Sequence, residues 1–397
     1  MELHGQNRFW KGLCAILVVL VAKTSIAQPS HKNYEIEARA HYGYLYFQND
    51  QYHSALARYS MHAPAFEFSI HRNTYGLHRW EVVHNYPSIG LTFYYSPFRN
   101  DSISKELGQV FALYPFINFH VVGNENSKLT FKLGVGLSYL TNKFDPKENY
   151  HNYAIGSHVN AAINLSFEYR QRIFDRLSWV TSAGLTHFSN GATRSPNMGI
   201  NIFSVATGFS WFLKPPKELI DRRLRPKNYL FEFDGKRHFV TDVEYTIGYK
   251  DLSQQYGTHQ FYLVHNLSGN FMFQLNERDR LGLGLDFIYD PSGQVVHPGW
   301  DMEIGVMAAY EMMLDRVSFM FNVGIRNNEK LFASAFLLYQ KIGARYYITD
   351  NLFAALSFTT YDIKADFISI GIGYHFNHKY YLPRHEKKPY RSPVYPR

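Results

Sequence analysis

Residues 129–139 read Leu-Thr-Phe-Lys-Leu-Gly-Val-Gly-Leu-Ser-Tyr, with an apolar side chain at every second position and a small or polar one between. Alternate side chains of a β-strand point to opposite faces, so this stretch predicts a strand with one apolar face. The same alternation recurs in residues 159–169, 281–289 and 368–376. Segments of this length that end in an aromatic residue are typical of tilted strands that cross a membrane, with apolar side chains toward lipid.

We therefore expect an all-β fold, a transmembrane antiparallel β-barrel, with its strands in two groups of eight. The first group covers about 34–48, 65–74, 87–97, 107–121, 129–142, 158–171, 177–188 and 200–213. The second covers about 239–250, 258–274, 279–290, 301–312, 316–326, 332–347, 352–362 and 367–376. A soluble β-sandwich would also alternate, but it needs neither strands this long nor so many aromatic strand ends.

A polar, proline-bearing stretch at 214–228 separates the two groups. It predicts a basic periplasmic linker between an eight-stranded region at 28–213 and a second strand region at 229–376. Two barrels could be joined there, or one large barrel could have a long periplasmic turn, because either arrangement pairs every strand edge. A basic, proline-containing tail follows at 377–397 and is expected to be extended.

The N-terminus is typical of a secretory signal peptide at residues 1–27. Arg8 and Lys11 precede a short apolar core, and Ser25-Ile26-Ala27 offers small residues at a cleavage site. The only cysteine, Cys14, lies inside this segment. Chemistry that needs a thiol is therefore not expected of the mature chain. A secreted membrane barrel belongs in the outer membrane of a Gram-negative bacterium.

The formal net charge is +8, and much of it lies in the linker and the tail. Anionic lipid headgroups are the expected partner of these basic clusters, since a secreted chain has little access to nucleic acid. A solvated linker and a solvated tail explain the same charge without any partner. No nucleotide-binding loop, metal-binding spacing or nucleophile elbow is present in the sequence.

One segment carries a combination of residues suited to catalysis. His187 and Ser189 share one face of the predicted strand that ends near 188, and Asn201 begins the outward-facing row of the next strand. A histidine beside a serine hydroxyl is the minimal pair of general base and nucleophile. Polar groups that face lipid are unfavourable unless they lie near the interface or have a task. The alternative is a polar strand end at the level of the headgroups.

The segment His187-Phe188-Ser189-Asn190, followed by Pro196-Asn197 and Gly199-Ile200, resembles the active-site region of the lipid A 3-O-deacylase (PagL) family. The resemblance covers about residues 33–213, and the later half lies outside it. It implies an eight-stranded outer-membrane barrel that hydrolyses an ester-linked acyl chain of lipid A without a metal or other cofactor.

The resemblance also implies roles for single residues. Ser189 would be the nucleophile and His187 the general base. Backbone amides at Asn190 and in the turn at Ala192 would form the oxyanion hole. The family's third residue, a glutamate that orients the histidine, corresponds to Asn201, whose amide oxygen can fix the imidazole tautomer but carries no charge. Arg194 in the adjoining loop could bind a phosphate of lipid A.

Two functions are therefore open from the sequence. The first is a lipid A esterase in the outer membrane, with lipopolysaccharide of the outer leaflet as its partner. The second is a non-catalytic barrel, either porin-like or a surface or structural protein, that retains the motif. Sixteen strands in one barrel would enclose an aqueous channel.

Overall fold

The computed structural model describes residues 33–46, 62–74, 78–98, 103–124, 126–214, 239–252, 261–296, 301–327, 337–361 and 364–378. The predicted signal peptide lies outside the described residues, as do all but the first residue of the predicted linker and the tail beyond residue 378.

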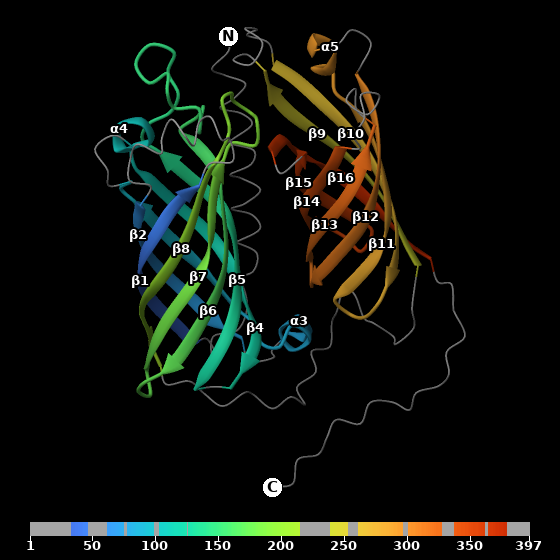
Figure 1. Cartoon of the computed structure of the whole chain (residues 1–397). Helices are drawn as coiled ribbons and strands as arrows, with labels where there is room; N and C mark the ends of the chain where they lie inside the picture. The colour runs from blue at the N-terminus through green and yellow to red at the C-terminus, as the bar shows by residue number, and fades with distance from the viewer. Residues whose placement is uncertain are drawn as a thin grey trace.

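The first eight strands form a closed antiparallel barrel in which each strand pairs with its neighbours in sequence and β8 returns to β1 (Figure 1). Tyr42 of β1 lies opposite Val205 of β8, which closes the sheet. The strands are β1 (Asn33–Tyr46), β2 (His62–Asn73), β3 (Ser88–Ser96), β4 (Val110–Gly123), β5 (Ser127–Leu140), β6 (Val159–Arg172), β7 (Leu177–Ser189) and β8 (Ile200–Phe212).

The second eight strands form a second closed antiparallel barrel, in which β16 pairs with β9. The chain therefore forms two eight-stranded barrels and not a single barrel of sixteen strands. The strands are β9 (Phe239–Asp251), β10 (Phe261–Gln274), β11 (Asp279–Tyr289), β12 (Met302–Leu314), β13 (Val317–Arg326), β14 (Leu337–Tyr347), β15 (Leu352–Tyr361) and β16 (Lys364–His378).

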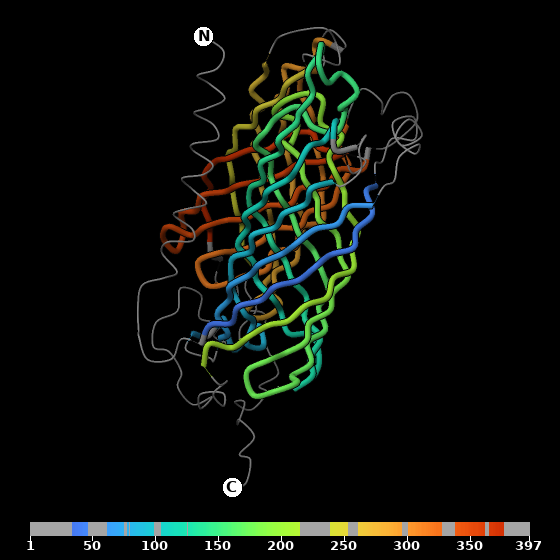
Figure 2. The backbone as a smooth tube through the Cα atoms, turned by 90° about the vertical axis from the view of Figure 1, so that its left-hand side faces the viewer, coloured from blue at the N-terminus to red at the C-terminus, as the bar shows by residue number. Residues whose placement is uncertain are grey.

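All sixteen predicted strands are present, with ends that differ by a few residues. At the C-terminal end of the second barrel, β16 continues beyond its predicted end at residue 376. It reaches His378 because Asn377 and His378 still pair with β9. The predicted tail therefore starts two residues too early. The strands are tilted around each barrel (Figure 2), as closure of a sheet requires.

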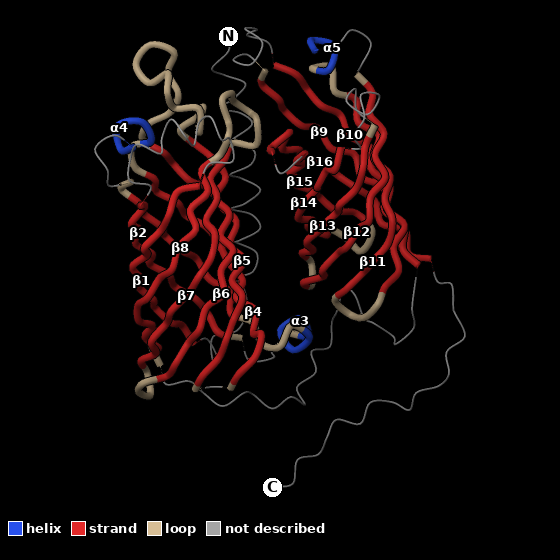
Figure 3. Tube along the Cα trace, in the orientation of Figure 1, coloured by secondary structure: helices blue, strands red, loops and turns tan. Residues whose placement is uncertain are grey.

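Within the described residues, helix is found in three short segments at the ends of the strands (Figure 3). They are α3 (Arg79–Val83), α4 (Ile103–Leu107) and α5 (Gly293–Val296). No helix in the described ranges has the length and apolar character needed to cross a membrane.

Charged side chains fill the middle of the first barrel. Arg39 lies 3.0 Å from a carboxylate oxygen of Glu37, 2.5 Å from Glu67 and 2.8 Å from Glu168, and all four side chains are almost fully buried. An eight-stranded barrel is just wide enough for its own side chains, and buried charges persist only when paired. The interior is therefore a packed ionic network, and the porin-like channel of sixteen strands is not formed.

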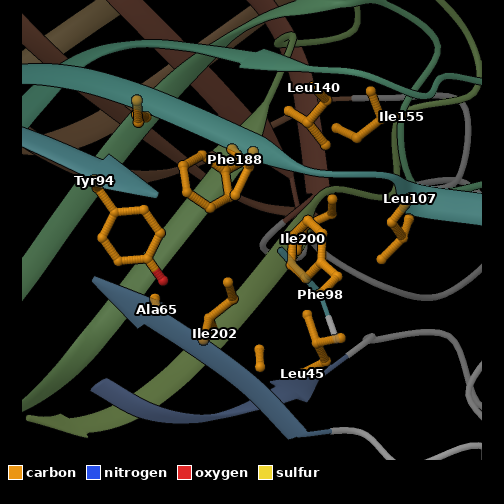
Figure 4. Packing of buried hydrophobic residues seen from close by; sticks show 14 of the residues in the cluster. Leu45, Ala65, Tyr94, Phe98, Leu107, Leu140, Ile155, Phe188, Ile200 and Ile202 are labelled. Carbon is orange, nitrogen blue, oxygen red and sulfur yellow. The ribbon is translucent and has the colours of Figure 1, made fainter. Parts of the chain in front are cut away.

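An apolar cluster fills the same barrel nearer the ends of β7 and β1 (Figure 4). Phe188 lies there fully buried beside Tyr94, with ring centroids 5.9 Å apart. Ile200 and Ile202 of β8 complete this part of the cluster. Because side chains alternate along a strand, the burial of these three residues directs the intervening His187, Ser189 and Asn201 to the outside of the barrel.

Candidate active site

The register between β7 and β8 brings His187 and Asn201 together. His187 near the end of β7 pairs directly with Asn201 at the start of β8, although fourteen residues separate them in sequence. Both project outward, as predicted from the alternation. Directly opposite residues of an antiparallel pair have side chains within reach of each other.

His187 and Asn201 form a short hydrogen bond, with 2.7 Å between Nδ1 and Oδ1. The amide of Asn201 is oriented by a second bond, in which Nδ2 donates to the carbonyl oxygen of Tyr46 over 3.4 Å. Since that carbonyl can only accept, Oδ1 faces the imidazole and accepts the Nδ1 proton. The Nε2 atom of His187 is thereby left as the basic nitrogen.

Ser189 follows two residues later on the same outward face, yet only 2% of its surface is exposed. Its Oγ accepts a hydrogen bond from the backbone N–H of Gly191 over 3.2 Å. Among the described residues no hydrogen bond joins Ser189 to His187. Catalytic hydrogen bonds often reach their final geometry only in the complex with substrate.

A tight turn follows the serine. Gly191 and Ala192 both adopt left-handed backbone conformations, with φ of 62° and 61°, and the N–H of Thr193 donates to the carbonyl of Asn190 over 3.3 Å. Left-handed backbone costs about 1–2 kcal/mol for a residue with a Cβ, so Ala192 needs support from its surroundings. Part of this support comes from the buried Asn190 side chain, whose Nδ2 donates to Arg194 O over 2.8 Å.

Asn197 belongs to the sequence motif, although no role for it was predicted. Its Oδ1 accepts the backbone N–H of Asn190 over 2.9 Å. Its Nδ2 is buried and has no hydrogen-bond partner among the described residues. An unsatisfied buried donor costs about 1–3 kcal/mol, so such a group is usually retained for a task. The only sequence feature that pointed to Asn197 was its place in the Pro196-Asn197 pair of the motif.

Gly199 lies against the imidazole of His187. A Cβ on Gly199 would come within 2.8 Å of His187 Cε1, and the backbone has a φ of 75°. Both the space and the conformation therefore require glycine. The remaining predicted residue, Arg194, has a side chain that is 42% exposed, with Nε 3.8 Å from Asp251 of the second barrel.

Among the described residues, one group of possible metal ligands lies elsewhere, inside the first barrel. Single ligand atoms of Glu35, Glu37 and His71 lie within 4.8 Å of one another. The guanidinium of Arg170 is 3.1 Å from Glu35 and 2.6 Å from Glu37. Arg170 thus already pairs with both carboxylates, so the group forms part of the ionic network.

The fold and this arrangement define an outer-membrane β-barrel protein with a serine, a histidine and an asparagine on the outer face of its first barrel. Residues 65–210 match the family Lipid A 3-O-deacylase (PagL). Residues 239–378 match the family Acyloxyacyl hydrolase, C-terminal domain. The two matches together cover well over half of the chain, which belongs to the PagL family. The later half, expected to lie outside the resemblance, thus matches a family model of its own.

Several solved structures are similar to this chain. The outer membrane enzyme PagL is 13% identical, with 43% of this chain and 97% of that chain covered and a TM-score of 0.29. Neisserial surface protein A is 9% identical, with 45% and 96% covered and a TM-score of 0.28. The Acinetobacter baumannii protein OccAB4 is 8% identical, with 88% and 99% covered and a TM-score of 0.24. No curated protein matched the chain.

Proposed function

We propose that the protein is an outer-membrane lipid A deacylase that hydrolyses an ester-linked acyl chain with Ser189 as nucleophile and His187 as general base. The observation that carries the proposal is the 2.7 Å bond from His187 to Asn201 on the lipid side of the barrel. It fixes the tautomer in which Nε2 accepts a proton, two residues from a serine hydroxyl.

The reaction follows acyl-transfer chemistry. Ser189 Oγ attacks the ester carbonyl of lipid A while His187 Nε2 takes the hydroxyl proton. His187 then gives this proton to the oxygen of the leaving sugar, and an acyl-serine remains. Water attacks the acyl-serine with His187 again as base, which releases the fatty acid and restores Ser189.

The oxyanion of the tetrahedral intermediate needs preorganised donors. The backbone N–H of Gly191 already points at Ser189 Oγ, and the turn continues through Ala192. The N–H groups of Gly191 and Ala192 are therefore two candidate donors. The Nδ2 of Asn197, which has no hydrogen-bond partner among the described residues, is a third. The backbone N–H of Asn190 is occupied by Asn197, so we assign Asn190 to holding the turn through its buried side chain. Removal of one such donor typically costs about 10²–10³-fold in rate.

Arg194 is proposed to bind a phosphate group of lipid A. Its side chain is 42% exposed at the same end of the barrel as Ser189. An arginine guanidinium matches the oxygens of a phosphate in a forked, two-bond geometry. Binding of the substrate headgroup in this loop would place the acyl chains along the outer wall of the barrel.

Mass spectrometry of lipid A tests the proposal. Cells that produce the wild-type chain should lose one acyl chain per lipid A, whereas Ser189→Ala and His187→Ala cells should keep it. Ser178→Ala is the matched control, because Ser178 lies on the same strand and points into the barrel. Identical lipid A in cells with and without the wild-type chain would overturn the assignment in favour of a non-catalytic barrel.

A further inference from the structure

The active-site turn of the first barrel contacts the second barrel at Asp251, the last residue of β9. The backbone N–H of Asp251 donates to the carbonyl of Ala192 over 3.0 Å. In return, Asp251 Oδ2 accepts the N–H of Ser195 over 3.1 Å, and the Asp251 carbonyl accepts Ser195 Oγ over 2.6 Å. Asp251 is only 1% exposed. Three hydrogen bonds thus attach the turn to a buried carboxylate-bearing residue of the other barrel.

A second contact is apolar. Ile368 of β16 shares the outer face of the second barrel with Ile372, but Ile368 is 5% exposed whereas Ile372 is 59% exposed. Gly191 covers Ile368 so closely that a Cβ on the glycine would lie 2.2 Å from Ile368 Cγ1. Gly191, two residues after the proposed nucleophile Ser189, therefore packs directly on the second barrel.

Arg194 adds a third link. Its guanidinium lies 5.9 Å from the centre of the Phe261 ring at the start of β10, as well as 3.8 Å from Asp251. The turn from Asn190 to Ser195 is therefore held from two sides. Asn190 ties it to Ser157 of the first barrel, and Asp251 ties Ala192 and Ser195 to the second.

We propose that the second barrel completes the active site, with Asp251 as a positioning residue for the turn that carries the oxyanion donors. This inference rests on the proposed esterase function. Gly191 N–H can serve the oxyanion only if the left-handed turn is held in place, and Ala192 has no conformational preference for that geometry. Asp251 supplies the bonds that hold it. The second barrel thereby acts on the rate of the chemical step from outside the first barrel.

Steady-state kinetics of the full chain test this role, with purified lipid A in detergent micelles as substrate. Asp251→Ala leaves the two hydrogen bonds of the Asp251 backbone in place and removes the bond from the N–H of Ser195 to Oδ2. It should lower kcat about tenfold or more with little change in KM, because a displaced donor weakens transition-state binding more than substrate binding. Asp251→Asn keeps an acceptor oxygen for Ser195 and should recover most of the activity. Asp301→Ala is the matched control, since Asp301 bonds to Gln294 within its own barrel.

Heat-modifiable migration on gels checks that each variant is folded. Folded Asp251→Ala with the kcat of Asp301→Ala would overturn the positioning role while leaving the esterase function intact. A wild-type chain that does not deacylate lipid A would remove the esterase function, and the positioning role with it.

A disulfide test examines the contact independently of activity. The only native cysteine, Cys14, lies in the predicted signal peptide, so introduced pairs react without competition. Ser195→Cys combined with Asp251→Cys should form a disulfide on mild oxidation. After cleavage at a protease site inserted in 214–228, the two halves should stay linked until reduced. Ser195→Cys with Asp301→Cys should not link them, and equal behaviour of the two pairs would overturn the inference.

Discussion

His187 Nδ1 donates a 2.7 Å hydrogen bond to Asn201 Oδ1, so an amide occupies the position at which the rest of the family is expected to use a carboxylate. An amide oxygen fixes the tautomer as a carboxylate would, but it does not stabilise the imidazolium by charge. In the proposed mechanism, His187 is therefore oriented as a base but receives less stabilisation when it takes a proton.

Substitution of Asn201 tests this difference. Asn201→Ala removes the orienting bond and should lower the deacylation rate by about 10²-fold, within the range for a misplaced proton-transfer group. Asn201→Glu restores a carboxylate next to His187 and should increase the rate. Rates are measured by release of fatty acid from lipid A. A slower Asn201→Glu enzyme would show that the site has adapted to an amide.

Gly199 should be intolerant of substitution. In Gly199→Ala the new methyl group would displace the His187 ring, so activity should fall about tenfold or more while the barrel still folds. Gly269→Ala provides a control, because a Cβ there meets nothing closer than 3.9 Å. If both variants retain full activity, His187 does not need its observed position.

Phe188 should contribute to stability rather than to chemistry. It is fully buried between His187 and Ser189, in the apolar cluster of the first barrel. Phe188→Ala should lower the free energy of unfolding by about 3–5 kcal/mol through lost burial and a cavity. Urea unfolding followed by tryptophan fluorescence measures the loss. Phe203→Ala, on the exposed outer face, should cost much less in detergent.

The two barrels should be separable folding units. Each closes its own sheet, so residues 28–213 alone should refold in detergent to a β-rich, heat-modifiable species. Circular dichroism and gel migration report this. A fragment that stays unfolded while the full chain folds would show that the first barrel depends on the second.

A second contact between the two barrels, formed by His84 and Met313 at the end away from the active-site turn, should respond to pH. Burial lowers the pKa of His84, which follows α3 and whose Nε2 lies 2.7 Å from the carbonyl of Met313 in β12. The folded state then binds this proton less readily than the unfolded state. The contribution of His84 to the stability of the folded state is therefore complete above the usual histidine pKa of about 6.5. It decreases as the pH falls below that value.

His84→Gln removes the titrating group and keeps an N–H donor. The free energy of unfolding of the wild type, minus that of the variant, should therefore decrease from pH 8 to pH 5. Urea unfolding at each pH measures this difference. A constant difference over this range would mean that His84 titrates normally in the folded chain.

The strands were predictable because their signal is local. Residues 129–139 became β5 with the expected faces, since period-two alternation is set by the backbone of a single strand. The outward direction of His187 and Ser189 followed from the same rule. The boundaries were less accurate, because pairing with a neighbour and not composition decides where a strand such as β16 ends.

Part of the site could not be predicted from the sequence. The roles of Asn197 and Gly199 depend on how the loop folds back onto Ser189 and His187, which no periodicity encodes. Arg194 carried a charge suited to phosphate, but its partners Asp251 and Phe261 lie more than fifty residues away in the other barrel.

The sequence by itself determined the all-β class, the sixteen strands and the outward placement of a serine, a histidine and an asparagine, because these follow from alternation along single strands. Only the tertiary structure decided that β8 returns to β1 and β16 to β9, giving two filled barrels instead of one channel. It also decided that Asp251 holds the active-site turn. Both depend on hydrogen bonds between segments far apart in the chain, along paired strands for closure and between a strand end and a loop for Asp251. Such bonds are fixed by closure and packing rather than by local sequence.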